Sequence, residues 1–297
     1  MTEPDALRLG LVGHPVAHSV SPDMHRAALA AAGLTGDYEL LDVPPEQLEG
    51  CVAGLRAGLR SGLNVTVPHK GAAARFCDRL APEAALAGAA NTLVRSPDGR
   101  IEGHNTDIAG LVAALQQAFS AAPWRGRAAV VLGAGGAGRA SVLAAFQAGA
   151  SEVRVWNRTP ERAQALVGEL APKVAGALVA FADPVEAARG AALVLQATTR
   201  GMATTVGDPA WSAARDEAAR VIAATAPDAA VLDLVYRPRE TPWVAAARAS
   251  GRRADDGLEM LVQQAAWAFR LWTGRTADPA VMRAAAEAAL APEKGGP

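Results

Sequence analysis

A glycine-rich segment in the middle of the chain constrains the fold more than any other feature of the sequence. The apolar run AAVVL ends in GAGGAG and continues directly into a helical pattern. In such a strand, turn and helix, the first glycine makes the tight turn, the second lets backbone amides approach a pyrophosphate, and the third allows close helix packing. The phosphates then lie at the positive helix end. The predicted dinucleotide contacts are Gly133, Ala134, Gly135, Gly136, Ala137 and Gly138.

The end of the next β-rich run indicates which dinucleotide binds. NAD enzymes usually place an acid there for the ribose 2′-hydroxyl, but this chain reads Asn157-Arg158-Thr159-Pro160. Asn157 offers a donor, and Arg158 and Arg162 can hold a 2′-phosphate through bidentate bonds. Thr159 and Pro160 also fit the N-cap and first position of a helix, and for Arg162 a solvated surface position is an equally good interpretation. We therefore expect NADP, held in part by Asn157, Arg158, Thr159 and Arg162.

Short β-rich runs alternate with alanine-rich segments of helical length through most of the chain. Three runs begin at Leu7, Tyr38 and Gly62, and a second series of five follows a polar turn at 124–127. This alternation predicts βαβ units in two successive α/β blocks with mostly parallel sheets, and 297 residues suffice for two domains. Two apolar stretches after Gly257 are predicted to be helices that could pack on either block.

Composition and charge exclude several classes of partner. The formal net charge is −1 with both signs mixed along the chain, so we expect neither nucleic acid nor an anionic membrane as partner, but a small molecule. Cys51 and Cys77 lack CxxC spacing, which favours a reducing compartment. The first ten residues carry acids and no long apolar run, and no later run is long enough for a membrane span. We therefore expect a cytoplasmic protein.

The first block contains polar residues suited to a nicotinamide enzyme, which must accommodate the exchanging carbon and handle a hydroxyl proton. Asn64 and Thr66 share one face of a predicted strand, and Pro68 ends it so that Lys70 projects from a turn or helix start. Asp107 lies just before the second block. In a cleft, Lys70 and Asp107 could transfer a proton or stabilise a developing alkoxide. From these two residues alone, a surface salt bridge is the better interpretation.

The histidines prompt a search for a metal site. None are paired as HExxH, no cysteine lies at ligand spacing, and ordinary polar roles suffice, so no metal is expected. The five residues are His14, His18, His25, His69 and His104.

Several motifs, in this order, resemble the shikimate dehydrogenase family over nearly the whole chain. They are GHPVAHSVSP with His25, NVTVPHK, ANT, NTD, GAGGAG with NRT, and GLEMLVQQAA. The resemblance implies an α/β fold with an N-terminal α/β substrate-binding (catalytic) domain, residues 1–106 and 257–297, to which the C-terminal helices return. Residues 107–256 would form a Rossmann-like, doubly wound NADP-binding domain. We expect a monomer or homodimer.

The resemblance further implies an activity and the residues that carry it. The activity is the NADPH-dependent, reversible reduction of 3-dehydroshikimate to shikimate, a step of aromatic amino acid (chorismate) biosynthesis. Ser19 and Ser21 would hold the substrate carboxylate, and Lys70 and Asp107 would be the catalytic pair. The other implied contacts are Asn64, Thr66, Asn91 and Gln264 at ring hydroxyls, Tyr236 close to the substrate from the cofactor side, and Gly257 at the cofactor.

Some positions keep alternatives open. Ser19 and Ser21 could cap the helix near Pro22, and Gln264 could lie on a solvated face. The residue after the NTD motif is often glycine in the family but is Ile108 in this chain. The segment that often reads NATxxG in the family reads QATTRG here. A dual quinate/shikimate dehydrogenase is the nearest rival, which Ser21 weakly disfavours because a threonine there would suggest quinate use. A non-catalytic ligand sensor is a remote alternative that the retained Lys70 and Asp107 argue against.

Overall fold

The computed structural model describes residues 6–202 and 204–291, so the ends of the expected domains and residue 203 lie outside the description. The chain divides into two compact units, Met1–Thr106 with Val262–Pro297, and Asp107–Leu261. We call these the first and second unit. The chain passes from one unit to the other within helix α5 (Thr106–Ala118) and again within helix α11 (Leu258–Thr273). Helix α11 begins one residue after the domain boundary expected at 257.

The first unit is built on a six-stranded sheet of order β2-β1-β3-β5-β6-β4. Neighbours of β1 run parallel to it, whereas β5 runs antiparallel to β3 and β6. Its strands are β1 (Leu7–Gly13), β2 (Gly36–Asp42), β3 (Gly62–Val65), β4 (Arg79–Leu80), β5 (Thr92–Arg95) and β6 (Ile101–His104). Its complete helices are α1 (Ser21–Ala31), α2 (Leu48–Arg56), α3 (Lys70–Phe76), α4 (Pro82–Ala87) and α12 (Pro279–Leu290).

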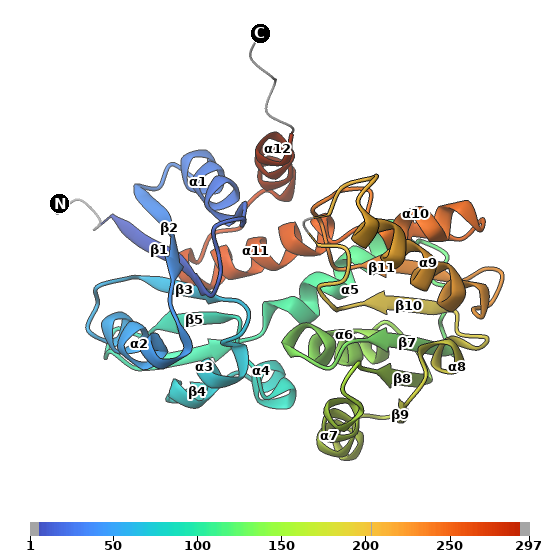
Figure 1. Ribbon diagram of the computed structural model, residues 1–297. Helices are drawn as coiled ribbons and strands as arrows, with labels where there is room; N and C mark the ends of the chain where they lie inside the picture. Colours follow the sequence, from blue (N-terminus) through green and yellow to red (C-terminus); the bar gives the residue numbers. More distant parts are fainter. Residues whose placement is uncertain (1–5, 203, 292–297) are drawn as a thin grey trace, which may run out of the picture. The chain divides into compact units, whose positions relative to one another are not determined.

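Helices cover both faces of this sheet (Figure 1). On one face, apolar residues of α2 and α3 pack against residues of β1 and β3 such as Val12 and Leu63. On the other, Trp272 of α11 packs against Leu9 and Tyr38, and α12 lies on α1. A Cβ on Gly62 would lie 2.3 Å from the Trp272 ring, so only glycine leaves room for that tryptophan. The predicted return of the C-terminal helices to the first block is therefore confirmed.

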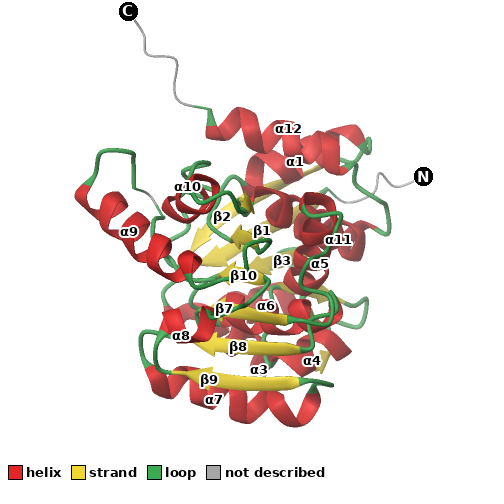
Figure 2. Cartoon of the chain, turned by 90° about the vertical axis from the view of Figure 1, so that its right-hand side faces the viewer, coloured by secondary structure: helices red, strands yellow, loops and turns green. Residues whose placement is uncertain are grey.

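The second unit contains an all-parallel sheet of order β12-β11-β10-β7-β8-β9. Figure 2 shows β10, β7, β8 and β9 in this sequence. The strands are β7 (Ala128–Leu132), β8 (Glu152–Trp156), β9 (Ala177–Phe181), β10 (Leu193–Gln196), β11 (Ala230–Asp233) and β12 (Arg253–Asp255). The helices are α6 (Gly136–Gln147), α7 (Pro160–Leu170), α8 (Pro184–Ala188), α9 (Pro209–Ala223) and α10 (Pro242–Ala249).

The strand order of the second unit reverses direction between β7 and β10. The chain moves outward through β8 and β9 and then through β10, β11 and β12 on the other side, which is the doubly wound arrangement. Ligands of such sheets bind beyond the carboxyl ends of the strands at the reversal point. The GAGGAG turn follows β7 and therefore lies at this point. No helix within the described ranges is long and apolar enough to cross a membrane.

Candidate active site

The turn after β7 has the geometry of a phosphate cradle. Gly133 has φ +117°, a conformation that favours glycine, and a Cβ on Gly138 would lie 2.1 Å from the carbonyl oxygen of Gly133. Helix α6 can therefore start directly against the turn. A Cβ on Gly135, the N-cap of α6, would meet nothing within 4 Å. This open approach to the amides at a helix N-terminus suits a pyrophosphate.

The segment after β8 braces this turn. The Ala134 amide donates to Asn157 Oδ1 at 3.1 Å, and Asn157 Nδ2 donates to the Thr159 carbonyl at 2.9 Å. Asn157 thus has a structural role at the candidate cofactor site. Thr159 is the N-cap of α7, as the sequence predicted, but its side chain makes no capping hydrogen bond. Arg158, directly after Asn157, and Arg162, in the first turn of α7, are both exposed.

The loops after β10 and β11 are tied together by a buried amide and a buried acid. Gln196 Oε1 accepts from the Thr198 amide at 2.6 Å, and its Nε2 donates to Asp233 Oδ1 at 3.3 Å. Burial raises the pKa of Asp233 to about 7, although the hydrogen bond from the Val235 amide, at 3.0 Å, acts in the opposite direction. The family's NATxxG segment often begins with asparagine, whereas this chain has Gln196 there. The longer glutamine amide reaches Asp233 on the neighbouring strand β11.

Tyr236 and Gly257 lie beyond this pair in the second unit. Tyr236 is partly buried in the loop after β11. A Cβ on Gly257 would lie 2.1 Å from the Leu234 carbonyl oxygen, and the Gly257 amide donates to the Val235 carbonyl at 3.1 Å. Gly257 therefore permits close packing against the segment that carries Tyr236, a role that needs no cofactor.

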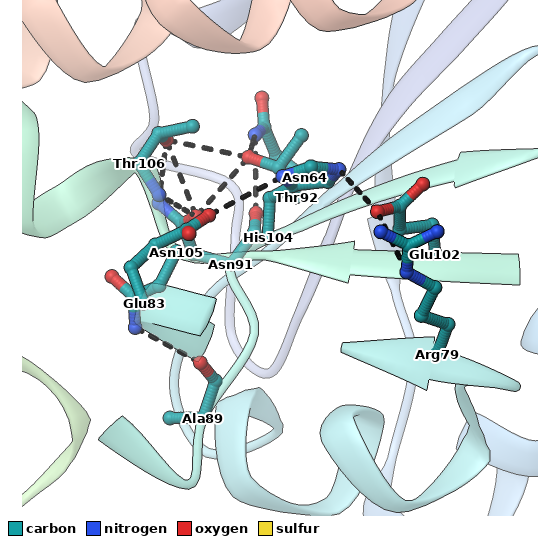
Figure 3. A network of polar contacts seen from close by, with 10 residues as sticks. All are labelled: Asn64, Arg79, Glu83, Ala89, Asn91, Thr92, Glu102, His104, Asn105 and Thr106. Atoms are coloured by element: carbon teal, nitrogen blue, oxygen red, sulfur yellow. Dashed lines mark hydrogen bonds and ion pairs between the residues drawn. The ribbon is translucent and has the colours of Figure 1, made fainter. Parts of the chain in front are cut away.

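A buried polar network occupies the centre of the first unit (Figure 3). Asn64 Nδ2 donates to the Asn91 carbonyl at 3.1 Å and to Thr92 Oγ1 at 3.0 Å. Asn91 Oδ1 accepts from the Thr106 amide at 2.8 Å, and its Nδ2 lies 3.5 Å from Gln264 Oε1. Gln264 is buried, so the alternative of a solvated face does not hold. The structure therefore brings Asn64, Asn91 and Gln264 together.

The remaining polar residues of the first unit lie around strand β3. Thr66, half-buried, follows β3 directly, and Lys70 is the first residue of α3, as predicted. The Lys70 carbonyl accepts from the Ala90 amide at 2.9 Å, which joins the NVTVPHK and ANT motifs. Asp107, 4% exposed, lies in the first turn of α5 at the division between the units. Lys70 belongs to the first unit and Asp107 to the second.

Ser19 and Ser21 lie at the start of α1. Ser21 is the first helical residue and Val20 the N-cap, which provides no side-chain cap. Ser19 Oγ accepts from the Ser21 amide at 3.2 Å and donates to Ser21 Oγ at 3.0 Å. Ser19 thus performs part of the capping role that the sequence left open.

Sequence reasoning missed the side chains that hold these residues in place. Thr92 and Thr106 join the amide network, and Tyr38 donates to Asn64 Oδ1 at 2.8 Å. The available signal was a tyrosine hydroxyl within the β-rich run YELLDV. Several histidines have local partners, among them His14 with Asp42 and His69 with the Val43 carbonyl. Within residues 6–202 and 204–291, no three potential ligand side chains form a metal-binding group.

The fold and these features define a Rossmann-type dinucleotide-binding protein with a second α/β unit that carries a buried polar network. Three family models match the chain: "Shikimate dehydrogenase substrate binding domain" over 11–93, "Shikimate / quinate 5-dehydrogenase" over 114–206, and "Shikimate 5'-dehydrogenase C-terminal domain" over 257–287. The chain belongs to the shikimate dehydrogenase family.

Similar proteins cover nearly the whole chain. A shikimate dehydrogenase (NADP(+)) of Thermus thermophilus is 44% identical over 96% of this chain and 99% of its own, and one of Methylobacterium radiotolerans is 46% identical over 90% and 91%. The T. thermophilus crystal structure with NADP(H) and shikimate matches with TM-score 0.82 and 42% identity, covering 96% of this chain and 100% of that one. A quinate dehydrogenase of Corynebacterium glutamicum with NAD matches with TM-score 0.81 and 31% identity, over 94% and 98%.

Proposed function

We propose that this protein is an NADP-dependent shikimate dehydrogenase, which reversibly reduces 3-dehydroshikimate to shikimate in aromatic amino acid biosynthesis. The near-complete match to relatives of that name carries the proposal. Residues 1–106 and 257–297 would be the substrate-binding domain, and residues 107–256 the NADP-binding domain. We expect a cytoplasmic monomer or homodimer.

The substrate is a ring that bears one carboxylate and several hydroxyls, and the first unit offers matching groups. Ser19 and Ser21 would donate to the carboxylate. Asn64, Asn91 and Gln264 would bind ring hydroxyls, together with Thr66, and Tyr236 would approach the substrate from the second unit. Burial of the three amides supports this assignment, because rigid polar groups discriminate between hydroxyl patterns more sharply than apolar ones do.

NADPH, when bound, supplies the hydride equivalent for the substrate ketone. The turn from Gly133 to Gly138 would hold the pyrophosphate with backbone amides, and Asn157, Arg158, Thr159 and Arg162 would surround the 2′-phosphate. Gly257 would contribute to the cofactor site through the close packing of its segment against the Leu234 carbonyl. The exposed arginines and the absence of an acid at the end of β8 favour NADP over NAD.

Lys70 and Asp107 would be the catalytic pair. During reduction the Lys70 ammonium would stabilise the developing alkoxide and provide the proton that makes the hydroxyl, and the Asp107 carboxylate would orient it. In the oxidative direction Lys70 would start as the neutral amine and take up the hydroxyl proton, with Asp107 again orienting it.

Replacement of the lysine tests this assignment. We expect Lys70→Ala to lower kcat for shikimate oxidation by about 10²-fold or more, the usual contribution of a general acid or base. The exposed Lys173 provides the matched control, and Lys173→Ala should retain wild-type rates. Initial rates followed by nicotinamide absorbance, with melting temperatures to confirm folding, measure both. A Lys70→Ala variant within a few-fold of wild type would remove Lys70 from the mechanism.

Dual quinate/shikimate specificity remains the nearest alternative, and the likeness to a quinate dehydrogenase supports testing it. Ser21 weakly favours shikimate, because a threonine there would suggest quinate use. A non-catalytic sensor would bind the ligands without turnover.

A further inference from the structure

Tyr38 lies beneath the candidate substrate residues of the first unit without belonging to any motif used above. It is fully buried on β2, and its hydroxyl donates to Asn64 Oδ1 at 2.8 Å. In the sheet register Tyr38 is opposite Leu9 of β1, which in turn is opposite Gly62 of β3. Asn64 lies two residues further along β3. The long phenol side chain thus reaches across the one intervening strand, β1, to the amide.

The orientation of the Asn64 amide follows from its partners. The backbone carbonyl of Asn91 can only accept, so the nitrogen of Asn64 must face it, at 3.1 Å. The oxygen then faces Tyr38. Burial raises the pKa of Tyr38 well above its ordinary value, so the phenol keeps its proton and donates.

Aromatic packing holds the phenol ring in this position. His25, one helical turn after Ser21 on α1, stacks on Tyr38 with ring centroids 4.3 Å apart and an interplanar angle of 5°. Burial lowers the pKa of His25 to about 3, so the imidazole is neutral. Trp272 covers both rings, with centroids 5.4 Å from His25 and 6.3 Å from Tyr38. The hydroxyl therefore has little freedom to leave Asn64.

We propose that Tyr38 is a positioning residue that fixes Asn64 for substrate binding, an inference that rests on the proposed function. With both N–H groups of Asn64 committed to Asn91 and Thr92, its remaining capacity is a lone pair on Oδ1. Asn64 can therefore accept a hydrogen bond from a substrate hydroxyl but has no N–H to give. The site selects a hydroxyl donor at this point of the ring.

The variant Tyr38→Phe keeps the ring and its stacking and removes only the hydroxyl. We expect KM for shikimate to rise about fivefold to tenfold, the size of one neutral hydrogen bond, with a smaller change in kcat. KM for NADP should stay at its wild-type value. In an Asn64→Ala background, Tyr38→Phe should raise KM much less than in wild type, because residues that act through one another are non-additive.

Trp124→Phe, in the second unit, is the matched control, since it also keeps a buried aromatic ring and removes one hydrogen bond, from Nε1 to the Ala148 carbonyl at 3.2 Å. It should lower the melting temperature and leave KM for shikimate unchanged. An unchanged KM in Tyr38→Phe, additive effects in the double variant, or an equal KM increase in Trp124→Phe would each overturn the inference. If the wild-type protein itself does not oxidise shikimate, the proposed function fails and the inference falls with it, an outcome that the first assay distinguishes from the others.

Discussion

Asp233, at the residue scale, is a carboxyl group whose protonation links stability to pH. It is fully buried at the end of β11, and burial raises its pKa to about 7. Between about pH 4, the ordinary value for an aspartic acid, and pH 7, the folded protein holds a proton that the unfolded chain has released. Raising the pH through this window therefore lowers the free energy of unfolding, and the loss is complete above it.

Asp233→Asn removes this dependence because the amide does not ionise. The free energy of unfolding of the variant relative to wild type should rise from pH 4 to pH 7 and then level off, by at most about 4 kcal/mol at roughly 1.4 kcal/mol per pKa unit. Denaturant unfolding of both proteins at several pH values measures the difference, in which other titrating groups cancel. A difference that does not change with pH would show that Asp233 ionises normally.

Residue roles were predictable only where a motif carried them. Asn91 and Gln264 were expected at the substrate through family motifs, and the structure brings them together in one buried network. Tyr38 and Thr106 were not predicted, because their roles arise from pairing between strands and from a helix start distant in sequence. The role of Asp233 could not be predicted, because the sequence does not show whether an acid within an apolar run will be buried with hydrogen-bond partners.

At the element scale, the turn between β7 and α6 contains glycines with two different roles. A Cβ at Gly138 would collide with the Gly133 carbonyl, whereas one at Gly135 would meet only open space. We expect Gly138→Ala to destabilise the protein by about 2 kcal/mol or more, because backbone must move. Gly135→Ala should stay within about 1 kcal/mol of wild type yet weaken NADP binding about tenfold or more, because its methyl group would occupy the phosphate approach.

Thermal unfolding and NADP titration of the two variants test this distinction. Equal stability of both variants would contradict the close contact at Gly138, and undiminished NADP affinity of Gly135→Ala would contradict a phosphate at the turn.

Elements with a strong local pattern were predicted closely. The runs at 7–13 and 128–132 coincide with β1 and β7, and the two C-terminal helices were found. The hairpin of β5 and β6 was missed, although Ser96-Pro97-Asp98-Gly99 forms its turn, with the Gly99 amide donating to the Ser96 carbonyl at 2.9 Å. Strands this short contain too few residues for their periodicity to be recognised.

At the scale of the whole molecule, the proposed function is divided between two α/β units. The second unit has an open helix N-terminus and exposed arginines, which we propose bind the dinucleotide, while the first buries hydrogen-bonding amides and hydroxyls, which we propose bind the substrate ring. The two-block organisation and the return of the C-terminal helices were predictable from alternation and resemblance. The division inside α11 was not, because a continuous helix carries no sequence signal where it passes between units.

The most direct test mixes the purified full-length protein with shikimate or quinate, each with NADP or NAD, and follows nicotinamide absorbance. An NADP-dependent shikimate dehydrogenase should reduce NADP rapidly with shikimate and react much more slowly in the other three combinations. Comparable rates with quinate would indicate dual specificity. No reduction in any combination, with a melting temperature that still rises on adding shikimate or NADP, would contradict the proposed activity and identify a binding protein instead.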